Sequence, residues 1–419
     1  MTERENTLAQ KASVLSAAAM VLVATLCALY MMSQFLRNSV GVIAPNLAVE
    51  IHLSAAEIGL LSSVYFLMFG IAQMPLGIAL DRFGPKLCLL ASVAVAVAGC
   101  VVFALAQTAH GLVVGRLLLG LGTASFLMAP LALYARWFAP ARFSTIAGVQ
   151  IGIGTLGSLF ATAPLAFATA AVGWRATFLG IGVITLGFGA LVWLIVRDDP
   201  PGTRTTPQRE SLRESLAGVW EVIRTPSIGR LFLLQLSNYP SYLLVVGLWG
   251  GPYLTHVYGF DLKGRGDLLF VPALAQVFGS LFWGPMDRVF GRYKPPVLIA
   301  VSATLASLLL LAAIGKPPLP VLLVLLIVLG FSTGLSSLVM AQGRLLLPPH
   351  LFGRGITLLN IGTMGGGFVV QFISGAMIDL FPAPDGVYPL QAYQLVFALQ
   401  AAFALIAGIV YLGSRDVRV

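Results

Sequence analysis

Charged side chains are scarce in this chain of 419 residues. Asp, Glu, Lys and Arg together make up 10 % of the sequence, whereas they make up roughly 25 % of an average soluble protein. Because hydrophobic residues account for 58 %, the chain cannot cover a water-exposed surface, which excludes a soluble enzyme and a disordered chain. The apolar residues form continuous runs of about twenty, which is typical of transmembrane helices and not of outer-membrane barrels. The sequence therefore predicts an all-α membrane protein.

Cysteine is also scarce, with Cys27, Cys88 and Cys100 as the three examples. An odd, scattered set inside apolar segments gives neither a disulfide framework nor the spacing of metal ligands. The sequence contains no G-x-x-x-x-G-K-[ST] phosphate loop, no G-x-S-x-G and no HExxH motif, each of which would indicate a known chemistry. We therefore expect no enzymatic activity, no use of ATP by this chain, and no cofactor or metal.

What the chain does have is twelve apolar segments, six before and six after a polar stretch at residues 197–228. This division predicts an N-terminal six-helix bundle over residues 1–196, a cytoplasmic linker with a short amphipathic helix over 197–228, and a C-terminal six-helix bundle over 229–419. Several segments exceed the ~20 residues that a bilayer needs, so tilt and kinks are expected. The predicted spans are about 14–46, 56–80, 87–107, 111–137, 144–171, 174–196, 229–257, 266–290, 295–314, 318–347, 353–381 and 390–413.

The 25 Lys and Arg residues are distributed unevenly between the two ends of these spans. If the N-terminus lies inside, 19 of them lie at or near the cytoplasmic side, four lie outside and two, Arg37 and Arg116, lie within spans. The positive-inside rule therefore predicts cytoplasmic termini in a multi-pass protein of the inner or plasma membrane. The basic residues that give the net charge of +9 are concentrated on one side of the membrane. We therefore expect the lipid bilayer, and no nucleic acid, as a partner.

Two charged segments repeat at equivalent positions in the two halves. The first is Gly77-Ile-Ala-Leu-Asp81-Arg82-Phe-Gly84-Pro-Lys86. The second is Gly284-Pro-Met-Asp287-Arg288-Val-Phe-Gly291-Arg292-Tyr-Lys294. They begin 207 residues apart, and each follows the second span of its half. The halves therefore look like two copies of one unit, with a binding site expected at their interface.

The first segment resembles the G-x-x-x-D-R-x-G-x-[KR] loop motif of the major facilitator superfamily, which also lies between spans two and three. Val114-Gly-Arg116-Leu-Leu-Leu-Gly120-Leu-Gly122 resembles the family's fourth-helix R-x-x-x-G-x-G motif, and Gly173-Trp174-Arg175-Ala-Thr-Phe178 resembles a frequent start of its sixth helix. The resemblance covers essentially the whole chain. It implies a secondary transporter with twelve transmembrane helices in two pseudo-symmetric six-helix bundles. The chain departs from the loop motif at Pro85, where a basic residue is common.

The resemblance implies that the loop motif is a gate between the two halves. Asp81 is expected to face the positive N-terminus of the eleventh helix, a contact that favours the outward-open state and breaks for inward opening. Gly77 and Gly84 allow close backbone approach and a tight turn. The alternative is that the charged pair only anchors the loop in the headgroups. The expected gating residues are Gly77, Asp81, Arg82, Gly84, Asp287 and Arg288.

One face of the first span is polar, because Tyr30, Gln34 and Arg37 follow helical spacing. An arginine at mid-membrane costs at least ~2.5–3.5 kcal/mol on insertion scales, so a compensating interaction is expected. We therefore predict that Arg37 contacts the substrate. The alternative is a structural role, in which backbone carbonyls or a glutamine satisfy the guanidinium. For Arg116 we expect the structural role, since no polar stripe surrounds it.

The seventh span repeats this layout with Asn238, Tyr239 and Tyr242, but no arginine belongs to its stripe. Two further polar residues of other spans, Gln150 and Asn360, are predicted to add to the same site. Gly120 and Gly122, which follow the arginine of the fourth span, indicate tight helix packing there.

The spans lack Asp and Glu near their middle, since the acidic residues lie at termini, loops and helix ends. Proton-coupled carriers commonly use a mid-membrane carboxylate, because its pKa can move into the working range. Any coupling of transport to an ion gradient must then use a different mechanism. A weak-acid substrate could carry the proton, one anion could exchange for another, or transport could be facilitated and uncoupled.

Arg37 resembles an arginine of the anion:cation symporter and organophosphate exchanger branches of the family, which implies an anionic substrate. A guanidinium suits a carboxylate or phosphate because it donates two parallel hydrogen bonds. Residue 36 is Leu, where the symporter branch often has Asp, and the helix-seven arginine of the exchangers is absent.

We therefore predict a monomeric, secondary active or facilitative transporter that moves a small organic anion, preferably a carboxylate, by alternating access. One alternative is an exporter of amphipathic drugs or metabolites with a structural Arg37. Another is a transporter-like sensor that binds a ligand without turnover.

Overall fold

The structure is a computed structural model that describes residues 3–138, 140–199, 222, 224–347 and 352–416. Eleven helices of this described part are long and apolar enough to cross a membrane. The fifth predicted span corresponds to α7 (Pro140–Phe160), whose apolar part, 145–160, is shorter. The predicted all-α membrane fold is confirmed. Most of the predicted linker lies outside the described residues, so its amphipathic helix stays a prediction.

The helices follow the order of the predicted spans. The N-terminal half contains α1 (Glu3–Asn38), α2 (Val40–Ile51), α3 (Ala55–Phe83), α4 (Pro85–Leu105), α5 (Ala109–Thr123), α6 (Ser125–Trp137), α7 and α8 (Ala163–Ile195). The C-terminal half contains α10 (Pro226–Leu244), the π-helical turn η1 (Val245–Trp249), α11 (Gly250–Tyr258), α12 (Leu262–Trp283), α13 (Met286–Phe290), α14 (Lys294–Ile314), α15 (Leu319–Thr333), α16 (Ser336–Leu345), α17 (Phe352–Ile378), the 3₁₀ turn η3 (Pro384–Gly386) and α18 (Leu390–Leu412).

Local sequence explains several of these boundaries. Ser54 and Glu57 form a capping box at the start of α3, which satisfies backbone donors that a helix N-terminus leaves open. Gly84 separates α3 from α4 with φ of 82°, a conformation that favours glycine. Gly173 has φ of 79° and divides α8 into two helical stretches. The break at Gly173 falls between the fifth and sixth predicted spans, at 171 and 174.

Four of the interrupted spans break at positions that the internal repeat relates. The first span breaks at Ser39, and the seventh passes through η1, which contains Val246, 207 residues later. The fourth span breaks at Ala124 and the tenth at Gly334, 210 residues later. The two halves therefore share these two interruptions, as expected for pseudo-symmetric copies.

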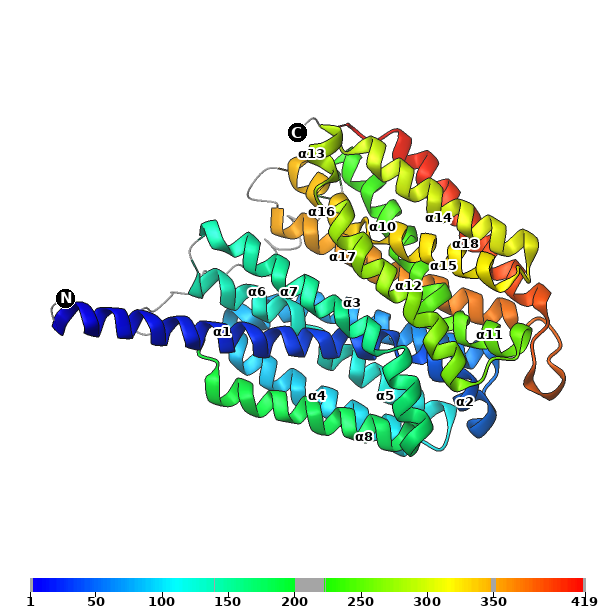
Figure 1. Cartoon of the computed structure of the whole chain (residues 1–419), viewed down its shortest axis with the longest axis horizontal. Helices are drawn as coiled ribbons and strands as arrows, with labels where there is room; N and C mark the ends of the chain where they lie inside the picture. Colours follow the sequence, from blue (N-terminus) through cyan, green and yellow to red (C-terminus); the bar gives the residue numbers. More distant parts are fainter. Residues whose placement is uncertain (1–2, 139, 200–221, 223, 348–351, 417–419) are drawn as a thin grey trace.

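Figure 1 shows the two halves as two helical bundles, with both chain termini toward one end. We call this end the terminal end, and it contains residues 84–86, 196–199, 291–294 and 413–416. The opposite end is the far end, and it contains residues 52–54, 106–108, 259–261 and 315–318.

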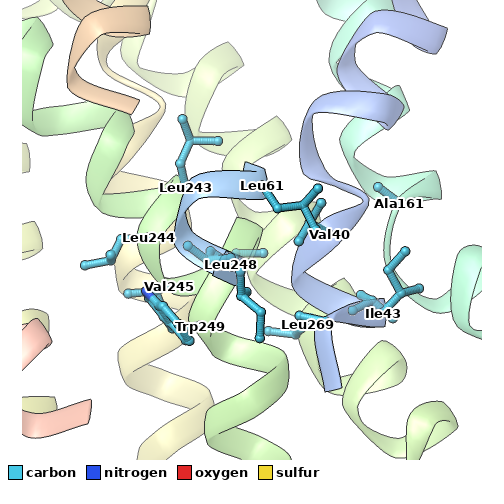
Figure 2. Packing of buried hydrophobic residues seen from close by; sticks show 14 of the residues in the cluster. Val40, Ile43, Leu61, Ala161, Leu243, Leu244, Val245, Leu248, Trp249 and Leu269 are labelled. Carbon is cyan, nitrogen blue, oxygen red and sulfur yellow. The ribbon is translucent and has the colours of Figure 1, made fainter. Parts of the chain in front are cut away.

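The buried core shows that the bundles join toward the far end and separate toward the terminal end. The largest cluster contains residues of both bundles. Figure 2 shows Val40 and Leu61 of the first bundle next to Leu248 of the second, and Ile43 of the first next to Leu269 of the second. The two other clusters each belong to a single bundle. Among the described residues, apolar surface is therefore buried between the bundles toward the far end, which holds that end closed.

The space beside three glycines on one face of α3 increases from the far end to the terminal end. A Cβ built on Gly59, nearest the far end, would lie 2.7 Å from the Cα of Gly375 in α17. A Cβ on Gly70 would lie 3.8 Å from the side chain of Met364, and one on Gly77 would have no neighbour within 4 Å. Because residues 59 and 77 are five helical turns apart, the widening gap reflects the angle between the bundles.

Candidate substrate site and gates

Arg37 is buried at the end of α1, two residues before the break at Ser39. It is 5 % exposed, and its guanidinium carbon lies 4.7 Å from the centre of the Phe69 ring. The phenol groups of Tyr30, Tyr65 and Tyr239 are close enough to interact with its charge. Within the described part of the chain, Arg37 has no carboxylate partner. A buried cation with only neutral neighbours is ready to bind an anion.

Unpaired polar atoms surround this arginine. Gln34 Oε1 and Arg37 Nε are buried and have no hydrogen-bond partner among the described residues. The hydroxyl groups of Tyr239 and Tyr242 are also buried without a hydrogen bond of full geometry, although they lie close to Arg37 and to Ser158 respectively. The two rings stack with centroids 5.9 Å apart. Each such group costs roughly 1–3 kcal/mol when left unpaired, so a ligand or water is expected to satisfy them.

The structure thus places the predicted stripe of the first span beside the stripe of the seventh. The close packing of Tyr30 depends on Gly154 of α7, because a Cβ there would overlap the Tyr30 ring. Two aromatic residues of this site, Tyr65 and Phe69, were not predicted. Their spacing of four residues places them on one face of α3, which is the signal that identifies them.

Two predicted site residues lie elsewhere. Asn238 donates to the Thr333 carbonyl at 3.1 Å and lines a small void of about 10 Å³ inside the second bundle. Gln150 accepts from Tyr134 at 2.7 Å and from Cys27 at 3.1 Å, and it donates to the Leu26 carbonyl at 3.0 Å. These hydrogen bonds all lie within one bundle, but Asn238 Oδ1 is buried without a partner among the described residues. A contact of either residue with substrate therefore stays a prediction.

Asn360 lies on α17 and is partly exposed. It is one helical turn from Met364, the side chain nearest to Gly70 of α3. This position is on the side of the Arg37 site that opens toward the terminal end.

Arg116 is fully buried and joins the fourth span to the first two. Its Nη1 donates to the Leu36 carbonyl at 2.6 Å and its Nε to the Leu61 carbonyl at 3.3 Å, while the Tyr65 ring lies 4.6 Å away. A Cβ on Gly120 would overlap the Tyr65 carbonyl, and one on Gly122 would overlap α4 at Ala96. These contacts are those of a packing residue.

The loop motif lies at the terminal end. Asp81 and Arg82 are exposed, and the Arg82 guanidinium lies 5.3 Å from the Phe83 ring. Residues 348–351, which precede the eleventh span, lie outside the described residues, so the contact expected for Asp81 stays a prediction.

In the second copy of the motif, the carboxylate of Asp287 accepts from the Tyr293 hydroxyl at 2.9 Å and from the Arg288 backbone N–H at 2.8 Å. Burial, together with the Asp287 carboxylate, raises the pKa of Tyr293 to about 12.

The structure adds another element to the repeat. Asp198, after the sixth span, accepts from the Lys86 backbone N–H at 2.7 Å, and Asp416, after the twelfth, accepts from the Lys294 backbone N–H at 3.2 Å. Each bundle thus caps the helix after its loop motif with a carboxylate from the end of its last span. A carboxylate at a helix N-terminus is favourable because the dipole is positive there.

Two pseudo-symmetric bundles that enclose a buried polar site define a membrane transporter. The chain belongs to the Major Facilitator Superfamily, which residues 26–266 and 231–418 match. The family and the relatives below are transporters and not enzymes, as predicted, and the protein is an integral multi-pass membrane protein.

The galacturonate transporter of Dickeya chrysanthemi is 26 % identical over 293 residues, which cover 67 % of this chain and 84 % of that protein. The hexuronate transporter of Escherichia coli strain K12 is 24 % identical over 393 residues, covering 88 % and 89 %. A crystal structure of a bacterial homologue of the human lysosomal transporter Spinster, in an inward-facing and unoccupied conformation, has a TM-score of 0.74 at 17 % identity. That alignment covers 95 % of this chain and 98 % of the other.

Proposed function

We propose that this protein moves a small organic anion, a carboxylate, across the inner membrane by alternating access, and that Arg37 binds the carboxylate. One observation carries the proposal: Arg37 is buried between the bundles, without a carboxylate partner in the described chain and beside unpaired polar groups. A carboxylate would neutralise the charge through charge-assisted hydrogen bonds, which are roughly twice as strong as neutral ones.

The hydroxyl and amide groups around Arg37 favour a substrate that also carries hydroxyl groups. Tyr239, Tyr242 and Gln34 each offer an unpaired buried atom, and a sugar acid could pair with all three. The names of two relatives, which transport galacturonate and hexuronate, support the same class of substrate.

The terminal end is proposed to be cytoplasmic, in line with the positive-inside rule. The state with a closed far end is then inward-facing. In this reading the exposed Asp81 and Arg82 belong to a gate that closes the terminal end in the opposite state, with Gly77 and Gly84 allowing close approach and Asp287 and Arg288 as its second copy. Asp81→Asn is expected to slow transport more than it weakens binding, and unchanged transport would remove the gating role.

The first experiment is a thermal-shift assay of the purified protein with galacturonate, with galactose as the matched neutral ligand. Galacturonate is expected to raise the melting temperature by mass action, and galactose is not. Arg37→Ala is expected to weaken galacturonate binding roughly 10- to 150-fold, the factor that a charge-assisted hydrogen bond of ~1.5–3 kcal/mol corresponds to. Arg37→Lys keeps the charge but loses the bidentate geometry, so an intermediate loss is expected.

Two outcomes would contradict the proposal. A shift produced by tetraphenylphosphonium, but not by galacturonate, and retained in Arg37→Ala would indicate an exporter of amphipathic cations. Galacturonate binding without flux into proteoliposomes would indicate a sensor.

A further inference from the structure

Arg265 connects the two bundles at the far end. It lies in the first turn of α12 and is 3 % exposed. Its Nε donates to the Val42 carbonyl at 2.7 Å and its Nη2 to Asn46 Oδ1, both in α2 of the other bundle. Its Nη1 donates to Thr255 Oγ1 at 3.0 Å within its own bundle.

All three acceptors of this guanidinium are neutral. No carboxylate of the described residues forms an ion pair with Arg265, although Asp261 lies close enough to interact with its charge. By contrast, Arg175 at the same end is paired with Glu50. Neutral acceptors compensate a buried cation less well than a carboxylate does. Replacement of these neutral acceptors by a carboxylate would therefore stabilise the Arg265 guanidinium.

Two of the three acceptors, Val42 and Asn46, belong to the same span as Arg37. Asn46 follows Arg37 by nine residues, or about 13 Å of helix toward the far end. If the bundles separate at this end, α2 has to move away from α12, which would break the hydrogen bonds to Val42 and Asn46. The guanidinium of Arg265 would then border the opened gap.

We propose that Arg265 is a second anion-binding residue, which exchanges Val42 and Asn46 for the carboxylate of the substrate when the far end opens. In the closed state its hydrogen bonds to α2 hold the bundles together. In the open state the carboxylate replaces them, so substrate stabilises that state. The inference rests on the proposed function, because it requires an anionic substrate.

The test measures the separation of the bundles at the far end with spin labels on Val49→Cys and Leu380→Cys. Both positions are highly exposed, at 77 % and 79 %, and one lies on each bundle. The native cysteines are all buried, so the labels go to the introduced sites. Distances are measured in the full-length protein with and without galacturonate, in Arg265→Gln, Arg265→Lys and Asn46→Ala. Lys263→Gln is the matched control, because Lys263 is an exposed cation two residues from Arg265.

Without ligand, Asn46→Ala is expected to raise the ratio of long to short distances about fivefold, the factor for one net hydrogen bond. Arg265→Gln removes two hydrogen bonds between the bundles, so a rise of roughly 30-fold is expected for it. Galacturonate is expected to lengthen the distance in the wild type, in Lys263→Gln and in Asn46→Ala. It is expected to have no such effect in Arg265→Gln, because a ligand shifts an equilibrium only through its differential affinity for the two states. Arg265→Lys should respond to a reduced extent.

Two results would overturn the inference while leaving the proposed function intact. In the first, Arg265→Gln gives the same distances as the wild type in both conditions. In the second, Arg265→Gln opens the far end but still responds to galacturonate as Asn46→Ala does. Arg265 would then hold the bundles together without binding the substrate. If galacturonate neither stabilises the wild type nor changes its distances, the proposed function fails as well.

Discussion

Gly59→Ala is expected to shift the transporter away from the state with a closed far end. The added methyl group would lie 2.7 Å from the Cα of Gly375 and 2.8 Å from the Gln371 carbonyl oxygen. Both are backbone atoms of α17, so a rotamer change cannot relieve the overlap. The helices must move apart, and overpacking of this kind typically costs about 1–3 kcal/mol. If the cost falls on the closed state alone, the ratio of closed to open molecules falls roughly 5- to 150-fold.

The spin labels at Val49 and Leu380 measure this shift. Gly70→Ala is the matched control, because it lies on the same face of α3 and its added Cβ would lie 3.8 Å from the Met364 side chain, an ordinary contact distance. We expect longer distances at the far end in Gly59→Ala and not in Gly70→Ala. If Gly59→Ala gives the wild-type distances at unchanged thermal stability, the far-end contact does not hold the state closed, and the reasoning is refuted.

Three further substitutions test other parts of the structure. Gly154→Ala is expected to displace the Tyr30 ring and weaken galacturonate binding about tenfold, a factor that corresponds to ~1.4 kcal/mol; Gly152→Ala, with no neighbour within 4 Å, should bind as the wild type does in the same titration. Arg116→Ala removes two buried hydrogen bonds and a ring contact, so we expect a loss of about 3 kcal/mol or more, seen as a lower melting temperature; an unchanged melting temperature would exclude the packing role. Asp198→Asn weakens the cap of α4 and should cost about 1 kcal/mol without altering galacturonate affinity; loss of affinity at full stability would contradict a capping role.

Helical spacing indicates which residues share a face of a helix, but it does not indicate what that face contacts in the folded protein. Asn238 and Tyr239 are neighbours in sequence and point about 100° apart on the helix. Both were predicted to contact substrate, yet Tyr239 lies beside Arg37 and Asn238 donates to Thr333 inside its own bundle. The spacing of polar residues alone could not separate the two, because a short polar stripe covers both directions.

The sequence also could not show which cations at the far end are buried, as Arg265 illustrates. Counted along the sequence it is one of four cations outside the membrane, and nothing local distinguishes it from Lys263. In the structure it is buried against α2 of the other bundle, while Lys263 is exposed. Its partners, Val42 and Asn46, are more than 200 residues away in sequence.

The sequence by itself determined that this is a helical membrane protein of two related halves with a buried arginine. Those properties are local, because a bilayer requires continuous apolar runs and a repeat is visible as a recurring motif. Tertiary structure alone decided which end of the molecule is closed, which tyrosines lie beside Arg37, and which side chains cross between the bundles. These depend on the angle between two bundles whose contacts are far apart in sequence. In the alternating-access mechanism that we propose, this angle changes, so a single sequence would be compatible with more than one set of contacts.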